Sequence, residues 1–426
     1  MSGIALAGCQ ATMPLVVRLD SKVRSPLRAL PGSDLTERLL RFTYNGQPTA
    51  EVHDESLRYF INEFWTAGQR QAHSIHEISY RACFKPQLPQ FFIERLTNPG
   101  DTVYDPFSGR GTTALEAALM GRRPAANDIN PLSEILVRPR LDPPSVESVR
   151  ERLRALGLTE ASPANDAHDL LVFYHSETLR QICALRSYLL NGCAHGTLDK
   201  IDDWIRMVAI NRLTGHSPGF FSVYTLPPNQ AVSLESQRKI NAARNQVPPR
   251  RDVAAIILKK TRTLLADGPP APHPPAILST GPSDATRHMP PASVDLVVTS
   301  PPFLNIVDYE GDNWLRCWFA GIEPKSVRVD RHKGIPAWEA FIRGTFAELA
   351  RLVRPGGIVA FEVGEVRGGK VMLERHVVEA IRGLPFNVLG VMVNQQAFTK
   401  TANCWGVSNN TTGTNTNRIV LAHRSG

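Results

Sequence analysis

Hydrophobic and polar positions follow an α/β rhythm between about residues 84 and 135. A helix at 87–96 ends before Asn98-Pro99-Gly100, a strong turn signal. A short apolar strand at 102–104 then runs into the turn Asp105-Pro106-Phe107-Ser108-Gly109-Arg110-Gly111-Thr112-Thr113, a helix at 114–120 and a second strand at 124–127. Strand, glycine turn, helix and strand form a βαβ unit, which predicts a doubly wound, Rossmann-like α/β sheet.

The same rhythm returns in the last third of the chain. Strands are predicted at 276–279 and at 294–299, where the sequence VDLVVT reads as fully buried. A long helix at 336–353 leads to a strand at 358–363, and the last two strands are predicted at 386–393 and 418–422. The polar segment 399–416 between those two strands is either a loop near the functional edge or a disordered hairpin.

Residues 140–275 follow a different pattern. Leu-, Ile- and Ala-rich helical segments alternate with charged ones, and the proline-rich stretch 267–275 stops regular structure. We therefore predict one catalytic domain from 71–139 and 276–426, a largely helical insertion at 140–275 and an N-terminal extension at 1–70. Within the extension, 57–65 (LRYFINEFW) is predicted as a short amphipathic helix.

Composition narrows the class of protein. The 426 residues are 42% hydrophobic and 21% charged, which fits two or three folded domains. No apolar run approaches the roughly 18 residues of a membrane span, which excludes an integral membrane protein. The six cysteines form no CxxC pair, which favours reduced thiols in the cytoplasm, and the histidines show no metal spacing, so we expect no metal. A net charge of +8 is compatible with a polyanionic partner.

The glycine turn is the first candidate for chemistry. Gly109 and Gly111 allow a ligand to approach the backbone, and Asp128, at the end of the next strand, can accept hydrogen bonds from both hydroxyls of a ribose. No Gly-Lys-Ser/Thr follows, which excludes a P-loop, and Ala114 stands where the dinucleotide pattern requires its third glycine. The turn therefore indicates a nucleoside cofactor without a pyrophosphate, the alternative being a turn that binds nothing.

Thr299-Ser300-Pro301-Pro302-Phe303 is the second candidate. It follows a buried strand, at the carboxyl edge where doubly wound sheets bind ligands. Because prolines lack N–H groups, the Ser300 hydroxyl and the Pro301 carbonyl are left as acceptors for an amine, and Phe303 offers a face for stacking. A purely structural exit from the strand is the alternative for this motif taken alone.

Together, DPFSGRGTT and TSPPF resemble the DNA amino-methyltransferases, which form N4-methylcytosine or N6-methyladenine. The resemblance covers about residues 80–135 and 276–426. It implies a seven-stranded doubly wound sheet, S-adenosylmethionine as cofactor, and double-stranded DNA with a flipped target base as substrate. The cofactor-binding residues that it implies are Lys85, Asp105, Phe107, Ser108, Gly109, Gly111, Thr112, Asp128 and Asp284. The catalytic residues that it implies are Ser300, Pro301, Pro302 and Phe303.

The identity of the target base depends on how this motif departs from the family pattern. The common adenine version begins with Asp and ends in Tyr, whereas this chain has Ser300 and Phe303, as in the cytosine-N4 subgroup. We therefore expect transfer of a methyl group to the N4 amine of cytosine in a specific DNA sequence. N6-adenine methylation, RNA base methylation and a catalytically inactive DNA-binding module remain as alternatives.

Basic residues in the insertion are candidates for DNA contacts, although a solvated helix face is an equal alternative. The residues are Arg238, Lys239, Arg250, Arg251, Lys259 and Lys260, joined by Lys400 and Asn403 in the polar segment. The resemblance also admits a cognate restriction endonuclease as a partner, which the sequence does not identify.

Overall fold

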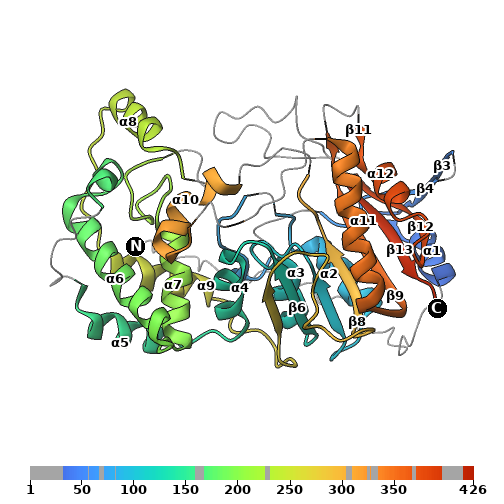
Figure 1. Ribbon diagram of the computed structural model, residues 1–426, viewed down its shortest axis with the longest axis horizontal. Coiled ribbons are helices and arrows are strands. Elements are labelled where there is room, and N and C mark those ends of the chain that lie inside the picture. The colour runs from blue at the N-terminus through green and yellow to red at the C-terminus, as the bar shows by residue number, and fades with distance from the viewer. Residues whose placement is uncertain are drawn as a thin grey trace, which may run out of the picture.

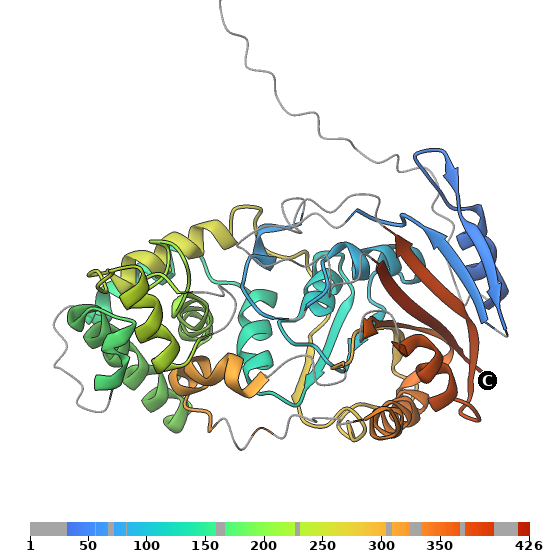
Figure 2. The ribbon, with the colours of Figure 1, turned by 90° about the horizontal axis from the view of Figure 1, so that it is seen from above.

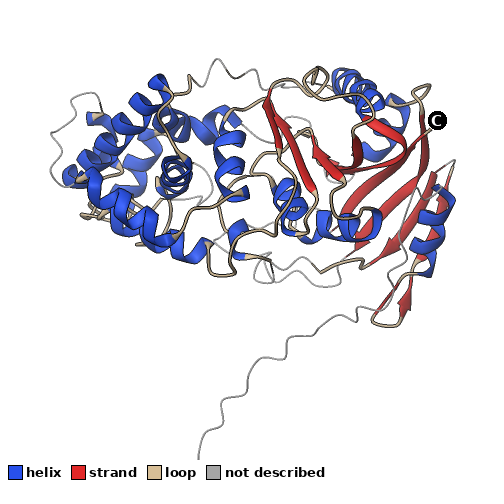
Figure 3. Ribbon diagram, turned by 90° about the horizontal axis from the view of Figure 1, so that it is seen from below, coloured by secondary structure: helices blue, strands red, loops and turns tan. Residues whose placement is uncertain are grey.

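A computed structural model gives the structure of the chain. It describes residues 32–55, 57–66, 72–81, 83–158, 167–225, 231–303, 309–323, 327, 334–366, 371–395 and 416–426. The described part has two ends: strands gather at one and helices at the other (Figures 2 and 3).

The centre of the strand-rich end is a nine-stranded sheet of order β3-β4-β12-β13-β9-β8-β5-β6-β7. Its strands are β3 (Ala50–Asp54), β4 (Leu57–Asn62), β5 (Thr102–Asp105), β6 (Arg123–Asp128), β7 (Ile277–Thr280), β8 (Val294–Thr299), β9 (Val353–Val363), β12 (Phe386–Gln395) and β13 (Thr416–Arg424). The five strands from β9 to β7 in this order are parallel, and β13 is antiparallel to both of its neighbours. Two small antiparallel pairs lie outside the sheet: β1 (Thr43–Tyr44) with β2 (Gln47–Pro48), and β10 (Glu365–Val366) with β11 (Val371–Met372).

Helices cover both faces of the sheet (Figure 1). They are α1 (Gly32–Arg41), α2 (Gln87–Leu96), α3 (Thr112–Leu119), α4 (Leu132–Leu141), α11 (Ile335–Leu352) and α12 (Leu373–Ala380). α11 and α12 pack on one face through side chains such as Phe346 and Val377. α1, α2 and α3 pack on the other face, where Phe92 is buried against Val103 and Leu296. Because both faces are covered, strands such as β8 are apolar at nearly every position.

The helical end is formed mainly by the middle of the chain. It contains α5 (Val146–Leu156), η4 (His168–Val172), α6 (Ser176–His195), α7 (Lys200–Arg212), α8 (Leu234–Ala243), α9 (Val253–Leu264) and also α10 (Tyr309–Ala320), with η2 (Ser74–His76) against α9. Trp204 is fully buried in its core, and Leu315 and Phe319 of α10 join that core. The predicted doubly wound sheet with a largely helical insertion is therefore confirmed, while α10 adds a helix from the second half of the catalytic region.

Two sequence-based expectations about the sheet are wrong. Residues 57–65 do not form a helix, because β4 pairs with β3 on one side and with β12 on the other. This hairpin also extends the expected seven strands to nine. The described part of the N-terminal extension thus contributes two strands to the catalytic sheet.

Candidate active site

The site lies at the point of the sheet where the order of strand addition reverses. From β5 the chain proceeds to β6 and β7 on one side, and β8 then starts the other side directly beside β5. Ligands bind to open α/β sheets at the carboxyl ends of the strands at this switch point. The glycine turn follows β5 and the Ser-Pro-Pro-Phe segment follows β8, so both predicted motifs meet there.

A hydrogen bond joins the two motifs directly. The hydroxyl of Thr299, the last residue of β8, donates to Asp105 Oδ1 at 2.5 Å, and Phe107 N donates to the same oxygen at 3.0 Å. Burial raises the pKa of Asp105 to about 7, against these hydrogen bonds, which lower it. Asp105 Oδ2 is buried and has no hydrogen-bond partner among the described residues, so this carboxyl can still serve a bound group.

The glycine turn has the tight geometry that the sequence predicted. Gly109 and Gly111 have φ angles of 52° and 78°, in the left-handed region that favours glycine. A Cβ on Gly111 would lie 2.3 Å from a methyl carbon of Val137 in α4, so no side chain fits there. The turn is thus packed against α4 at the buried Gly111, while Gly109 remains partly accessible.

Asp128 connects the end of β6 to this turn. Its Oδ2 accepts from Gly109 N at 2.7 Å and its Oδ1 accepts from Asn130 N at 2.8 Å. Burial raises the pKa of Asp128 to about 6, while these backbone hydrogen bonds lower it. Since each carboxylate oxygen has a second lone pair, the side chain can accept two further hydrogen bonds.

The other predicted cofactor-binding residues surround the same edge. Phe107 contacts Phe341 of α11 with ring centroids 5.5 Å apart, and Thr112 begins α3. The Ser108 hydroxyl is buried and finds no hydrogen-bond partner in the described ranges. Asp284 lies in the turn after β7, beside Gly344 of α11. That turn is tied to the end of β6, because Gly281 N donates to the Asp128 carbonyl at 2.9 Å.

The Ser-Pro-Pro-Phe segment is braced by α11 and β9. Trp338 of α11 donates its indole N–H to the Pro302 carbonyl at 3.0 Å, and Pro301 is buried. The Phe303 ring lies so close to Gly364 that a Cβ there would be 3.0 Å from it. Ser300 remains partly accessible at the end of β8.

A cavity of about 270 Å³ opens beside Ser300. Its lining residues are Trp65, Cys83, Phe84, Lys85, Leu88, Ser300, Phe303, Glu362 and Asn417. The structure therefore brings Lys85, predicted for the cofactor, to the same cavity as Ser300 and Phe303. Burial lowers the pKa of Lys85, and the nearby Arg110 lowers it further.

Sequence reasoning missed the other six residues of this cavity, which are Trp65, Cys83, Phe84, Leu88, Glu362 and Asn417. Trp65 follows the misassigned β4, and Asn417 lies in β13, just after the polar segment 399–416. Glu362 gave a usable signal, since it is a single charge within the apolar strand sequence IVAFEV. Asn417 Nδ2 donates to Glu362 Oε1 at 2.5 Å, and burial raises the pKa of Glu362 while hydrogen bonds from Asn417 and Ser300 lower it.

The basic residues of the insertion differ in accessibility. Arg238 and Lys239 lie on α8 and are exposed, as are Arg250 and Lys259, whereas Arg251 is half-buried. Lys260 is only 11% exposed and pairs with Glu77 at 3.3 Å, so it contributes to the packing of α9 against η2. Lys400 and Asn403 lie outside the described residues.

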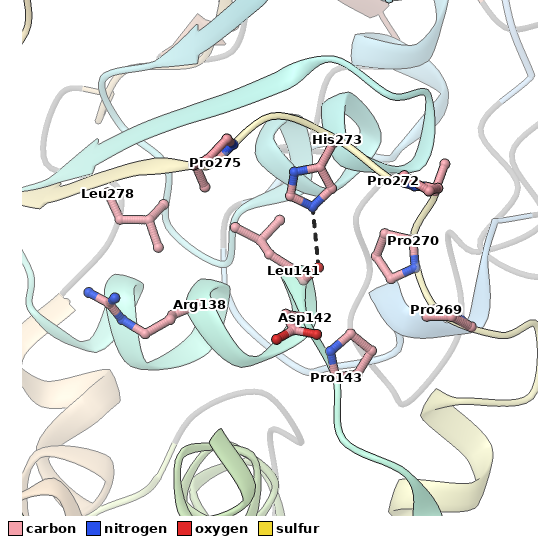
Figure 4. A pocket seen from close by; sticks show the side chains of 12 residues that line it. Arg138, Leu141, Asp142, Pro143, Pro269, Pro270, Pro272, His273, Pro275 and Leu278 are labelled. Atoms are coloured by element: carbon pink, nitrogen blue, oxygen red, sulfur yellow. Dashed lines mark hydrogen bonds between the residues drawn. The ribbon is translucent and has the colours of Figure 1, made fainter. Parts of the chain in front are cut away.

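A larger cavity of about 580 Å³ lies at the outer edge of the sheet, beside β7 (Figure 4). Half of its twelve lining residues come from the proline-rich stretch 267–275, and His273 Nε2 lies 3.3 Å from the Leu141 carbonyl. It contains none of the predicted site residues.

Three further observations concern the described part of the chain. It contains no group of three His, Cys, Asp or Glu side chains placed to hold a metal ion. Its four cysteines, Cys83, Cys183, Cys193 and Cys317, form no disulfide. None of its helices has the length and apolar character needed to span a membrane.

Known proteins share parts of this chain. Residues 34–138 match the family model of the N6/N4 methyltransferases, described as DNA methylase. The type II methyltransferase M.BsoBI of Geobacillus stearothermophilus is 24% identical over 337 residues, which is 66% of this chain and 62% of that protein. The type II methyltransferase M.MjaII of Methanocaldococcus jannaschii is 32% identical over 84 residues, which is 20% of this chain and 16% of that protein.

The chain thus spans less than two thirds of the length of either relative. Among solved structures, a DNA modification methylase of Thermus thermophilus in complex with S-adenosyl-L-methionine is 21% identical and matches with a TM-score of 0.21. The match covers 34% of this chain and 54% of that one. These matches support a DNA methylase as the class of protein. Within that class, the family model and the type II relatives support the DNA amino-methyltransferase family.

Proposed function

We propose that this protein transfers a methyl group from S-adenosylmethionine to the exocyclic N4 amine of cytosine in DNA. The observation that carries the proposal is the hydrogen bond between Thr299 and Asp105, which holds the glycine turn and the Ser-Pro-Pro-Phe segment together. Cofactor and target base would therefore meet at a single switch point of the sheet.

The residues at the turn fit this cofactor. Within the part of the chain that the structure describes, the buried Asp105 Oδ2 and Ser108 Oγ have no partners, and Asp128 has spare acceptor capacity for the two ribose hydroxyls. Lys85 supplies a positive charge at the neighbouring cavity, where the carboxylate of a bound amino acid would be stabilised. S-adenosylmethionine supplies an electrophilic methyl group when bound.

The residues after β8 orient the target amine. The lone pair of an exocyclic amine is delocalised into the ring, so the amine becomes nucleophilic only when its protons are held by acceptors. Ser300 Oγ and the Pro301 carbonyl are the acceptors that we assign, and Phe303 stacks on the base. Orienting the amine in this way contributes to the rate without a covalent intermediate. Leaving the duplex stack costs a base a few kcal/mol, and stacking on an aromatic ring returns about 1–3 kcal/mol.

Ser300 and Phe303 support cytosine as the target, since the motif otherwise begins with Asp and ends in Tyr in the common adenine version. The basic residues of the helical end support duplex DNA as the substrate. α8, which carries Arg238 and Lys239, stands at the top of Figure 1, on the same side as β11, which follows the carboxyl end of β9. A duplex over the carboxyl edge of the sheet would therefore lie beside α8.

The experiment is mass spectrometry of nucleosides from DNA incubated with the protein and S-adenosylmethionine, with RNA of the same sequence in parallel. We expect N4-methylcytosine in the DNA and no methylated base with Ser300→Ala. N6-methyladenine alone would refute the cytosine assignment and leave an amino-methyltransferase. Methylation of RNA only would refute DNA as the substrate, and cofactor binding without any product would indicate an inactive binding module.

A further inference from the structure

Resting on the proposed function, we propose that Glu362 is a positioning residue. It takes the hydroxyl proton of Ser300 in a hydrogen bond and so presents Ser300 Oγ to the target amine as an acceptor. The feature behind this proposal is the polar end of the cavity beside β8, which Ser300, Glu362 and Asn417 form together.

The hydrogen bonds at this end have one direction. Asn417 Nδ2 donates to Glu362 Oε1 at 2.5 Å. The Ser300 hydroxyl lines the same cavity from the adjacent strand, and we assign its proton to the same carboxylate, whose pKa it lowers. A serine hydroxyl has only one proton. Once that proton points at Glu362, both lone pairs of Ser300 Oγ face away from the carboxylate, and the oxygen can only accept.

The position of Glu362 explains how a neutral serine can occupy a place that is acidic in the common adenine version of the motif. β9 lies next to β8, and Thr299 of β8 pairs with Phe361 in the register. Ser300 follows Thr299, and Glu362 follows Phe361. Ser300 and Glu362 therefore lie at the same level on adjacent strands. The negative charge that the acidic residue supplies in the adenine version is here supplied by the Glu362 carboxylate on the neighbouring strand. It acts on the target amine through the Ser300 hydroxyl.

The same arrangement accounts for the proton that the reaction must release. The nitrogen lone pair forms the new N–C bond, and the electron pair of the broken S–C bond stays on the sulfur, which loses its positive charge. The methylated nitrogen then has one proton too many. That proton moves to Ser300 Oγ as the hydroxyl proton of Ser300 moves to the Glu362 carboxylate, which later releases it to solvent. Since burial raises the pKa of Glu362, the carboxylate is a stronger base here than in water.

The first test compares wild type with Glu362→Gln, which keeps the size of the side chain and removes the charge. In single-turnover methylation of DNA, we expect the rate to fall about 100-fold or more, because the proton acceptor is removed. The affinity for S-adenosylmethionine should change less than twofold. The wild-type rate should rise with pH through the pKa of Glu362, since only the carboxylate accepts a proton, and this rise should disappear in the variant.

Cys83→Ala is the matched control. Cys83 and Lys85 are the other titratable groups that line the cavity, and burial raises the pKa of the Cys83 thiol. The control variant should keep the rise in rate with pH. Equal rates for wild type and Glu362→Gln would overturn the proposal, as would loss of the rise with pH in Cys83→Ala.

A second measurement needs neither turnover nor a fully active variant. The Glu362 carboxyl is titrated by carbon-13 NMR in the wild-type protein and in Ser300→Ala. Because the hydroxyl stabilises the carboxylate, its removal should raise the pKa of Glu362, and an unchanged titration would overturn the proposal. If the wild type methylates no DNA, the proposed function fails instead, while the titration still decides whether the two side chains are coupled.

Discussion

At the scale of single residues, the site depends on carboxyl groups that the fold keeps away from water. Asp105, Asp128 and Glu362 all have raised pKa values, and burial is the main cause for each. Each also accepts hydrogen bonds that partly offset this cost. Perturbed groups gathered at one sheet edge are typical of functional sites, since ordinary packing rarely buries so many acids together.

The pKa of Asp128 predicts how cofactor affinity depends on pH. Ribose hydroxyls donate to the carboxylate, so binding favours the charged form, whereas the free protein holds a proton on Asp128 below a pKa of about 6. Affinity should therefore be constant well above pH 6 and fall, by up to about tenfold per pH unit, below it. Calorimetric titration with S-adenosylmethionine between pH 5 and 8 measures this dependence.

Asp128→Asn is the control for this prediction. Its affinity should be lower at pH 8, and the part of the pH dependence that belongs to residue 128 should be absent. An identical pH dependence in wild type and variant would remove Asp128 from the ribose-binding role.

At the scale of elements, the decisive contact joins β12 to the segment that follows β4. Asn394 is fully buried; its side-chain oxygen accepts from Phe64 N at 2.7 Å and from Trp65 N at 3.2 Å. Its amide donates to the Trp65 carbonyl at 3.1 Å. One side chain thus fixes the path of the backbone at Trp65, which lines the cavity.

Asn394→Ala should therefore destabilise the protein by about 2–4 kcal/mol, because two buried backbone N–H groups lose their acceptor. Urea unfolding followed by tryptophan fluorescence measures this change. The exposed neighbour Gln395 supplies the control: Gln395→Ala should stay within about 0.5 kcal/mol of wild type. A comparable loss in both variants would show that the hydrogen bonds of Asn394 are not the cause.

These elements also show which parts of the structure can be predicted from sequence. The VDLVVT strand was predicted to the residue, because a run of apolar residues ending at a polar turn needs no distant information. β4 was missed because the apolar residues of LRYFINEFW also fit an amphipathic helix, and its second partner β12, which places β4 inside the sheet, lies more than 300 positions later. Glu362 was missed for a related reason: only the neighbouring strand shows that its carboxylate meets Ser300.

At the scale of the whole molecule, the strand-rich and helical ends lie side by side, with α10 of the second half packed into the helical core. The helical end carries exposed cations on α8. We therefore expect the helical end to provide a second contact surface for DNA, at a distance from the atoms that react.

The salt dependence of DNA affinity tests this role of α8. Arg238→Ala combined with Lys239→Ala should reduce the slope of log affinity against log salt by up to about 1.8, since each phosphate that a cation neutralises contributes about 0.9 to the slope. Affinity for S-adenosylmethionine should not change. Filter binding or fluorescence anisotropy at several salt concentrations gives the slope.

Arg150→Ala combined with Arg154→Ala on α5 is the matched control, since α5 lies at the bottom of Figure 1, opposite α8. This pair should leave the slope unchanged. If the two double variants behave alike, α8 is an ordinary solvated surface.

The pairing of β4 with β12 has a consequence for how the protein is made. Phe64 and Asn394, which join across this seam, are 330 positions apart in the chain. At about 5–20 residues per second, a ribosome needs roughly 15–65 s to pass from one to the other. During that interval the β3–β4 hairpin has emerged from the ribosome with one edge unpaired, and such an edge can pair with another nascent chain. Chaperone demand should therefore be greatest late in synthesis, and β4 is the segment at which to look for aggregation of unfinished chains.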